Sequence, residues 1–188
     1  CFRICYYIIM KTEIAVFGGG CFWCTEAIFK SFRGVISVMP GYAGGHTDNP
    51  SYEEVSIHTS GHIEVVRVEY DPARISFKTL LTVFFATHDP TTRDRQGNDV
   101  GPQYRSVVFY MNSVQRRETE EMIAHLNAEL SAGGPVVTEV RPFEKFYEAE
   151  HYHRDYYANN KSQPYCQLVI NPKLEKLQKQ FAELLATP

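Results

Sequence analysis

The sequence predicts an α+β fold, with a single compact domain in which a mixed, mostly antiparallel sheet is flanked by helices. Its 188 residues are enough for one domain with a substantial core. Hydrophobic residues make up 44% of the chain and charged residues 22%, which is ordinary for a globular protein. Strand-like and helix-like segments follow one another in mixed order, without an internal repeat, and this order favours the α+β class.

The strands are predicted from apolar or alternating runs that end at turn residues. They cover residues 13–17, 35–39, 62–70, 106–111 and 136–141. The third run alternates only in part and is stopped by Asp71 and Pro72. After the second run, glycines predict a loop from Pro40 to His46, which turn residues continue to Ser51.

The helices are predicted from capping residues and apolar periodicity. They cover residues 22–32, 76–88 and 114–131, one helical turn at 52–55, and a C-terminal helix. Ser76 is the expected N-cap of the second helix, and Asn171 followed by Pro172 is expected to begin the last one. Residues 146–160 are predicted to be helical at least in part. Residues 91–105 form a long polar loop, and such a loop is usually functional or disordered.

Charge and cysteine usage limit the classes of function. The net charge of −3 gives no reason to expect a nucleic acid or an anionic membrane as a partner. No segment approaches the apolar length that a membrane span needs. The five cysteines do not have the spacing of a disulfide framework, so we expect reduced thiols and a cytoplasmic protein.

The run from Gly18 to Glu26 carries the strongest chemical signal. Three glycines follow an apolar strand, turn the chain sharply and would let another molecule approach the backbone. Cys21 then stands at the start of a helix, where free N–H groups and the helix dipole favour a thiolate. Phe22 and Trp23 form an apolar patch beside the sulfur, unless they are ordinary core residues. The pattern indicates an enzyme whose cysteine attacks a small, partly apolar electrophile.

Two further cysteines are candidates to trap an oxidised Cys21. Cys24 lies one helical turn later and is either a disulfide partner or core filler. Cys166 lies on a segment that is interpreted as a flexible tail, or else as a strand that continues into Leu168. The sequence pattern alone does not decide which of the two thiols would react with an oxidised Cys21.

Three polar positions are compatible with a site or with ordinary structural roles. Glu64 lies in an apolar run and is commonly an exposed edge residue there. If Glu64 is partly buried, desolvation raises its pKa and makes it a usable general acid near neutral pH. Asp99 and Tyr104 lie in the long loop, where turn and packing roles are common.

The cluster from Glu150 to Tyr157 is either a solvated helix face, a polar pocket wall or a set of metal ligands. Cys21 and Cys24 with His151 or His153 would complete a tetrahedral zinc set. The chain has no second C-x-x-C, and an aromatic pair inside the first one is unlike a structural zinc knuckle. Zinc is therefore a minor alternative.

Several of these motifs together resemble the A-type peptide methionine sulfoxide reductases. The resemblance begins with Gly20-Cys21-Phe22-Trp23 and extends from about Glu13 to Cys166. It also includes, in the family's order, the segments Gly41–Gly45, Tyr52–Val55, Gly61–Glu64, Tyr70–Pro72, His88–Pro90, Arg95–Ser106 and His153–Tyr156. Residues 1–9 and the C-terminal helix lie outside it.

The resemblance implies a reaction and a role for each site residue. The family reduces the S epimer of methionine sulfoxide, free or in oxidised proteins, and uses no metal or organic cofactor. Thioredoxin or a similar dithiol regenerates the enzyme. Cys21 would be the nucleophile and Glu64 the proton donor, assisted by Tyr52 and Tyr104. Phe22, Trp23 and Tyr156 would form an apolar pocket for the methyl group of the substrate. Asp99 would hold the polar side of the pocket, with His153 near it.

The chain departs from the commonest family pattern in its resolving thiol. Many members have glycine directly after the Phe-Trp pair, where this chain has Cys24, and many have two recycling cysteines in a glycine-rich tail. Cys166 matches the first of these only approximately, and no cysteine follows it. We therefore take Cys24 as the resolving thiol, with Cys166 as the alternative.

We thus expect a monomeric sulfoxide reductase with a ferredoxin-like core, whose single catalytic domain spans residues 10–188. Residues 1–9 precede Met10 and are interpreted as a non-native or over-called leader. The alternative enzyme is a general thiol–disulfide oxidoreductase that uses Cys21 and Cys24. The alternative outside enzymes is a zinc-stabilised binding module.

Overall fold

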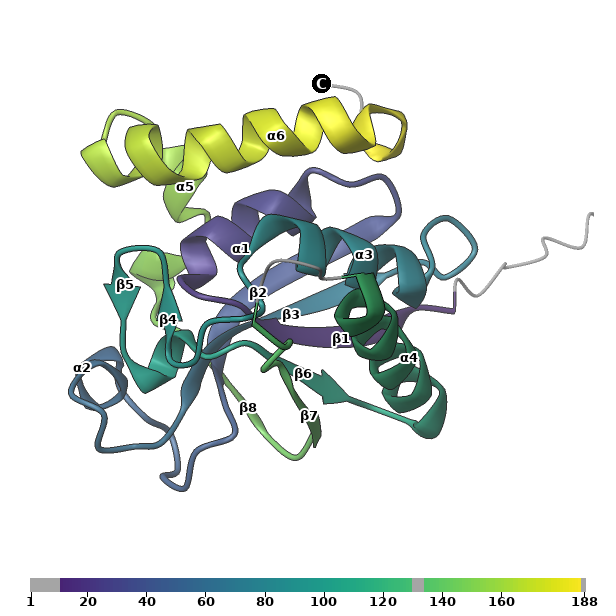
Figure 1. The fold of residues 1–188 in the computed structure, drawn as a ribbon. Coiled ribbons are helices and arrows are strands. Elements are labelled where there is room, and N and C mark those ends of the chain that lie inside the picture. Colours follow the sequence, from purple (N-terminus) through teal and green to yellow (C-terminus); the bar gives the residue numbers. More distant parts are fainter. Residues whose placement is uncertain (1–10, 130–133, 187–188) are drawn as a thin grey trace, which may run out of the picture.

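The computed structural model describes residues 11–129 and 134–186 and is built on a six-stranded sheet (Figure 1). The strand order is β7-β6-β1-β3-β2-β8. All neighbouring strands are antiparallel except β6 and β7, which are parallel, so the predicted mixed and mostly antiparallel sheet is confirmed. The strands are β1 (Glu13–Gly18), β2 (Val35–Ala43), β3 (Ile63–Tyr70), β6 (Val107–Tyr110), β7 (Glu139–Pro142) and β8 (Phe146–Glu148).

The centre of the fold has the ferredoxin-like order β1-α1-β2-β3-α3-β6, with α1 at Phe22–Lys30 and α3 at Phe77–Thr87. Its four strands lie side by side as β6-β1-β3-β2. The predicted α+β class is therefore confirmed. Ser76 caps α3 as expected, because its hydroxyl accepts the N–H of Thr79.

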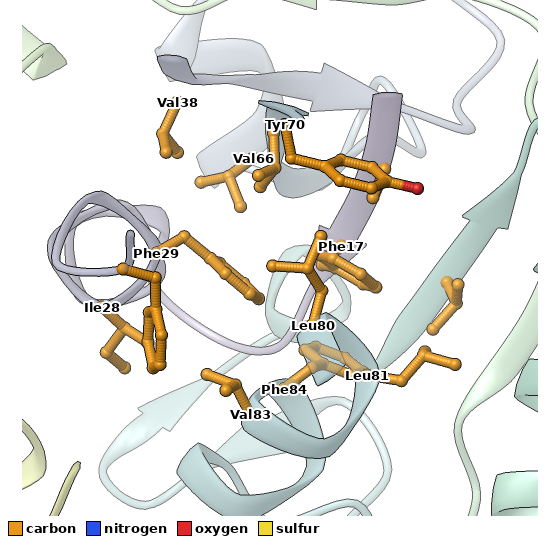
Figure 2. Packing of buried hydrophobic residues seen from close by; sticks show 14 of the residues in the cluster. Phe17, Ile28, Phe29, Val38, Val66, Tyr70, Leu80, Leu81, Val83 and Phe84 are labelled. Carbon is orange, nitrogen blue, oxygen red and sulfur yellow. The ribbon is translucent and has the colours of Figure 1, made fainter. Parts of the chain in front are cut away.

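The main core lies between the sheet and the helices α1 and α3, and Phe17 of β1 is at its centre. The ring of Phe17 stacks on Phe29 of α1 at 5.1 Å and on Phe84 of α3 at 5.0 Å between ring centroids. Figure 2 shows these rings with Leu80 and Val66 around them. Since truncation of a buried phenylalanine costs roughly 3–5 kcal/mol, this cluster holds the strand and both helices together.

The remaining helices surround this core. They are α2 (Tyr52–Ser56), α4 (Ser113–Glu129), α5 (Tyr156–Asn159) and α6 (Asn171–Phe181). Figure 1 shows α6 lying across the outer side of α1, where its Leu177 is buried. Helix α2 begins with a capping box, in which Ser51 and Glu54 each accept an N–H from the other's backbone. None of the helices in the described part of the chain is long and apolar enough to cross a membrane.

Pairing between distant strands changes two predicted segments near the sheet. The segment from Gly41 to Ala43, predicted as a loop, continues strand β2, because it pairs with β3 on one side and with β8 on the other. Residues 146–160, predicted to be helical at least in part, begin with strand β8 against that same end of β2 and are helical only later, at His151–His153 and in α5. In both cases pairing with a distant strand outweighs the local glycine and helix signals.

The long polar segment 91–105 is ordered. It folds into a small hairpin of β4 (Arg95–Gln96) and β5 (Asp99–Val100), followed by a 3₁₀ turn at Pro102–Tyr104. The turn ends at Tyr104, one of the predicted site residues. This segment therefore presents Asp99 and Tyr104 from defined positions.

The entry into α6 also differs from the prediction. A single turn of π-helix, Cys166–Ile170, leads directly into α6, so this segment is not a strand and Asn171 is not a helix cap. The side-chain oxygen of Asn171 instead accepts the hydroxyl of Tyr157 at 2.8 Å. The interpretation of residues 1–9 as a leader lies outside the described residues.

Candidate active site

Cys21 stands at the turn between β1 and α1, immediately before the first helical residue. Gly20 has φ of +93°, and a Cβ atom there would lie 2.8 Å from the side chain of Gln96. At Gly19, a Cβ atom would lie 2.8 Å from the ring of Phe84. The glycines therefore make room for the protein's own side chains, rather than for the second molecule that the sequence pattern indicated.

Glu64 is buried on β3, directly below the start of α1. Its side chain is 2% exposed, and Oε2 accepts the N–H of Phe22 at 3.1 Å. Burial raises the pKa of Glu64 to about 8, although the hydrogen bond from Phe22 acts in the opposite direction. Glu64 therefore meets the condition set in the sequence analysis for a general acid, because it is buried and its carboxyl is mostly protonated at neutral pH.

The thiols of Cys21, Cys24 and Cys166 pack in one buried cluster. Burial raises the pKa of Cys21, and the hydrogen bond to Cys24 and the charge of Glu64 add to this effect. The pKa of Cys24 is lowered to about 7, chiefly because it accepts the hydrogen bond from Cys21. Burial therefore opposes the thiolate that the helix N-terminus favours at Cys21.

Cys166 does not lie on a flexible tail. It begins the π-helical turn before α6, and its side chain is fully buried. Burial raises the pKa of this thiol, and the charge of Cys24 adds to the shift. Cys166 therefore belongs to the thiol cluster without any movement of its segment.

Aromatic side chains form one wall beside Cys21. The rings of Trp23 and Tyr156 stack with centroids 3.7 Å apart and planes 8° apart. The indole N–H of Trp23 donates to Nδ1 of His153 at 3.0 Å. The ring of His153 also lies 4.9 Å from Phe22 and 4.6 Å from Tyr52. Burial lowers the pKa of His153, which keeps the imidazole neutral and able to accept the indole hydrogen.

Tyr156 is held in this wall by a contact that the sequence analysis did not predict. Asp155, the residue before it, adopts the left-handed conformation with φ of +54°. Its N–H donates to the carboxylate of Glu26 on α1 at 3.0 Å, and Glu26 is 1% exposed. Lys30 also binds Glu26 at 2.9 Å. Glu26 therefore ties the turn that carries Tyr156 to the helix that carries Trp23.

Tyr52 and Tyr104 both face the Glu64 side of the site. Burial raises the pKa of each hydroxyl, and the charge of Glu64 is the next largest cause for both. Tyr104 also packs against the cluster of cysteine side chains. Both phenols are therefore neutral hydrogen-bond donors near the carboxyl that would protonate a substrate.

Asp99 is bound by a residue that was not predicted for the site. The hydroxyl of Tyr165 donates to Oδ2 of Asp99 at 2.8 Å and lies 3.7 Å from Sγ of Cys24. The ring of Tyr165 also meets the ring of Trp23 edge-on, with centroids 5.8 Å apart. His153 contacts the aromatic wall through Trp23 and Phe22. The only signal for Tyr165 in the sequence was its place next to Cys166.

A cavity of about 640 Å³ opens beside this tyrosine. Its walls include Tyr165, Asp99, Leu168 and Lys173. Lys173 lowers the pKa of Cys24 through its positive charge. Tyr165 thus contacts both this cavity and the thiol of Cys24.

The side chains proposed for zinc are not assembled into a metal site. Across residues 11–129 and 134–186, no group of three or more His, Cys, Asp and Glu residues is placed to hold a metal ion. His153 faces Trp23, and Cys24 faces Tyr165. The zinc-module alternative therefore has no support from this geometry.

Comparisons with known proteins agree on one family. The family model described as peptide methionine sulfoxide reductase matches residues 13–185. A peptide methionine sulfoxide reductase MsrA from Saccharolobus solfataricus is 55% identical over 171 residues, which are 91% of this chain and 96% of the relative.

Solved structures show the same likeness. Methionine sulfoxide reductase A of Corynebacterium diphtheriae matches with a TM-score of 0.76 and 36% identity over 79% of this chain and 75% of that chain. Mxr1 from Saccharomyces cerevisiae in its reduced form matches with a TM-score of 0.77 and 31% identity, over 85% and 92%. Mxr1 has also been solved in complex with Trx2. The chain belongs to the peptide methionine sulfoxide reductase family and is an oxidoreductase of that family.

Proposed function

We propose that this enzyme reduces the S epimer of methionine sulfoxide, free or in oxidised proteins, by attack of Cys21 on the sulfoxide sulfur. The observation that carries this proposal is the position of Glu64, which is buried beside the start of α1. Its Oε2 lies 3.1 Å from the backbone nitrogen of Phe22, the residue that follows Cys21. A sulfoxide sulfur becomes a good electrophile only when its oxygen gains a proton, so a thiol and an acid must converge on one small group.

The first step uses both groups. The proton of Cys21 moves to its partner Cys24, and the thiolate attacks the sulfur while Glu64 gives its proton to the oxygen. Protonation of Glu64 also removes a like charge that would otherwise disfavour this thiolate. Methionine then leaves, and Cys21 retains the oxygen as a sulfenic acid.

The stacked rings of Trp23 and Tyr156, with Phe22, offer an apolar wall for the methyl group of the substrate. Tyr52 and Tyr104 would donate hydrogen bonds to the sulfoxide oxygen. Asp99 and His153 would bound the polar side. An asymmetric site with one apolar wall and one acid can distinguish the two epimers at sulfur, because only one of them places the methyl group and the oxygen correctly together.

The second step forms a disulfide, and we assign Cys24 as the resolving thiol. Its hydrogen bond with Cys21 and its pKa of about 7 support this assignment. Cys166 is the alternative, because it packs in the same cluster, but its raised pKa makes it the poorer nucleophile.

A dithiol such as thioredoxin would then reduce the disulfide by thiol exchange. The complex of the similar yeast protein Mxr1 with Trx2 supports this partner. We further propose that the enzyme is a monomer and acts in the cytoplasm, where thiols such as the free Cys21, Cys24 and Cys166 stay reduced.

The test is a single turnover of the pre-reduced protein with each epimer, in which methionine and free thiols are both counted. We expect methionine from the S epimer alone, with two thiols lost per methionine. Cys24→Ser should lose only one thiol, whereas Cys166→Ser should behave as the wild type. If the folded, reduced protein forms no methionine from either epimer but reduces disulfides, it is a general thiol–disulfide oxidoreductase instead.

A further inference from the structure

We infer that Tyr165 and Asp99 form a proton path that serves the resolving thiol, so that Cys24, Tyr165 and Asp99 act in line during disulfide formation. The inference rests on the proposed function in one respect, namely that Cys24 resolves Cys21. It gives a catalytic role to Tyr165, whose hydroxyl touches the sulfur that reacts.

The direction of the path follows from the hydrogen bonds. A tyrosine has a single hydroxyl hydrogen, and Tyr165 donates it to Oδ2 of Asp99 at 2.8 Å. The oxygen of Tyr165 is then free to accept the S–H of Cys24, whose sulfur lies 3.7 Å away. Protons can therefore pass from the thiol to the phenol as the phenol gives its own proton to the carboxylate.

The resolving step needs such an acceptor. In the resting protein Cys24 accepts a hydrogen bond from the thiol of Cys21. That thiol hydrogen is gone once Cys21 is a sulfenic acid, so Cys24 depends more on its remaining partners. Burial raises the pKa of Tyr165 above its ordinary value, so the phenol remains neutral and passes the proton on without holding a charge.

The reaction balances with groups already present. Sγ of Cys24 attacks Sγ of Cys21, the new S–S bond forms, and the S–O bond of the sulfenic acid breaks. The oxygen leaves as water with the proton of Glu64, which solvent has restored. The proton of Cys24 reaches Asp99 through Tyr165. Asp99 and Tyr165 both line the cavity of about 640 Å³, through which that proton can return to solvent.

Other titratable groups also surround Cys24 and shape its pH dependence. Cys21 precedes it on the same helix turn, and Glu64, Cys166 and Lys173 face it from β3, the π-helical turn and α6. These groups are the same in wild type and in a Tyr165→Phe variant. A difference between the two proteins in pH dependence therefore reports the hydroxyl of Tyr165.

The experiment compares wild type, Tyr165→Phe and the control Tyr157→Phe in a quenched single turnover with the S epimer. Methionine reports the first step, and mass spectrometry of alkylated protein reports the Cys21–Cys24 disulfide. The control is matched, because Tyr157 packs on the same cluster and donates to Asn171 of α6, away from the thiols.

Since proton transfer by a positioned group contributes at least about 100-fold, we expect disulfide formation in Tyr165→Phe to be slower by about that factor near pH 6. The gap should close towards about pH 9, where Cys24 ionises without the path. Methionine formation should continue in the same variant, so that the sulfenic acid accumulates and can be trapped with dimedone. Tyr157→Phe should form the disulfide as the wild type does.

Three results would overturn the inference. In the first, Tyr165→Phe forms the disulfide at the wild-type rate throughout the pH range. In the second, its deficit is the same at every pH, which indicates a packing role. In the third, Cys24→Ser still loses two thiols, so that no proton of Cys24 needs to move. The last result removes Cys24 from the proposed function, while absence of methionine from the wild type would remove the reductase itself.

Discussion

Replacing Glu64 with glutamine separates acid chemistry from packing at the centre of the site. Glutamine has nearly the same shape and retains an oxygen that can accept the N–H of Phe22. In the wild type, that backbone nitrogen lies 3.1 Å from Oε2 of Glu64. It has no proton to give to a sulfoxide at neutral pH. Because a positioned general acid contributes roughly 10²–10⁴-fold, we expect methionine formation by Glu64→Gln to slow by at least about 100-fold.

The raised pKa of Glu64 sets the magnitude and the pH dependence. With a pKa of about 8, roughly 90% of this carboxyl is protonated at pH 7, against about 0.3% for its ordinary value of 4.5. Burial therefore raises the population of the acid by about 300-fold. The ratio of wild-type to Glu64→Gln rates should fall above about pH 8, because only the wild type loses an acid there and thiol ionisation is common to both.

The same burial lowers the free energy of unfolding. Between 4.5 and about 8 the folded protein binds a proton at Glu64 that the unfolded chain has released. The unfolded state thus binds fewer protons, and stability falls as pH rises through this window. At pH 7 the cost is about 3 kcal/mol. Glu64→Gln should therefore unfold at higher urea concentration than wild type at pH 7, and at a similar concentration near pH 4.

The assay is a rapid-quench single turnover from pH 5 to pH 9, with urea unfolding at both ends of the stability window. Glu69→Gln is the matched control, because Glu69 lies on the same strand, is half-buried, and accepts the hydroxyl of Ser37. A Glu64→Gln variant that forms methionine within a few-fold of wild type at pH 7 would refute the acid role. A rate ratio that does not change with pH would refute the assigned pKa.

Three further substitutions test the surroundings of the site. Glu26→Ala removes the acceptor of the Asp155 N–H, so the fluorescence of Trp23 should change. KM should rise about 10-fold, which corresponds to a loss of about one to two kcal/mol of substrate binding. Unchanged emission would contradict the role of Glu26 in holding Tyr156 beside Trp23. Gly20→Ala must adopt φ of +93° against Gln96, so Tm should fall by an amount equivalent to about 1–3 kcal/mol; an unchanged Tm argues against strain. Ser51→Ala loses the capping box of α2 and should cost about 1 kcal/mol in urea unfolding, with no effect expected on the chemistry of the thiols.

The sequence by itself determined the family, the fold class and the nucleophile candidate. The family is confirmed by the match over residues 13–185, and the ferredoxin-like order by the sheet. The predictions of the family and the fold class succeeded because their signals are local. An apolar run after Glu13, a glycine turn before Cys21 and a capping serine at position 76 act on neighbouring residues, whatever the rest of the chain does.

Only the tertiary structure decided the protonation states of the site. Glu64 has an ordinary edge-strand pattern in the sequence, and the desolvation that raises its pKa comes from strands and helices packed around it. The start of a helix favours a thiolate at Cys21, whereas burial by distant segments raises the pKa of the same thiol. Desolvation depends on every atom that replaces water, and so no short window of sequence contains it.

The tertiary structure also decided which distant residues meet. Ala43 continues a strand because β3 and β8 provide partners, although its local glycines indicate a loop. Tyr165 reaches Cys24 and Asp99, which lie 141 and 66 positions away in the chain. Residue types and spacing predict the chemistry that a site contains, whereas its contacts arise from the packing of the whole chain. Packing is set by the joint burial of many side chains, so it has no signature at any single position.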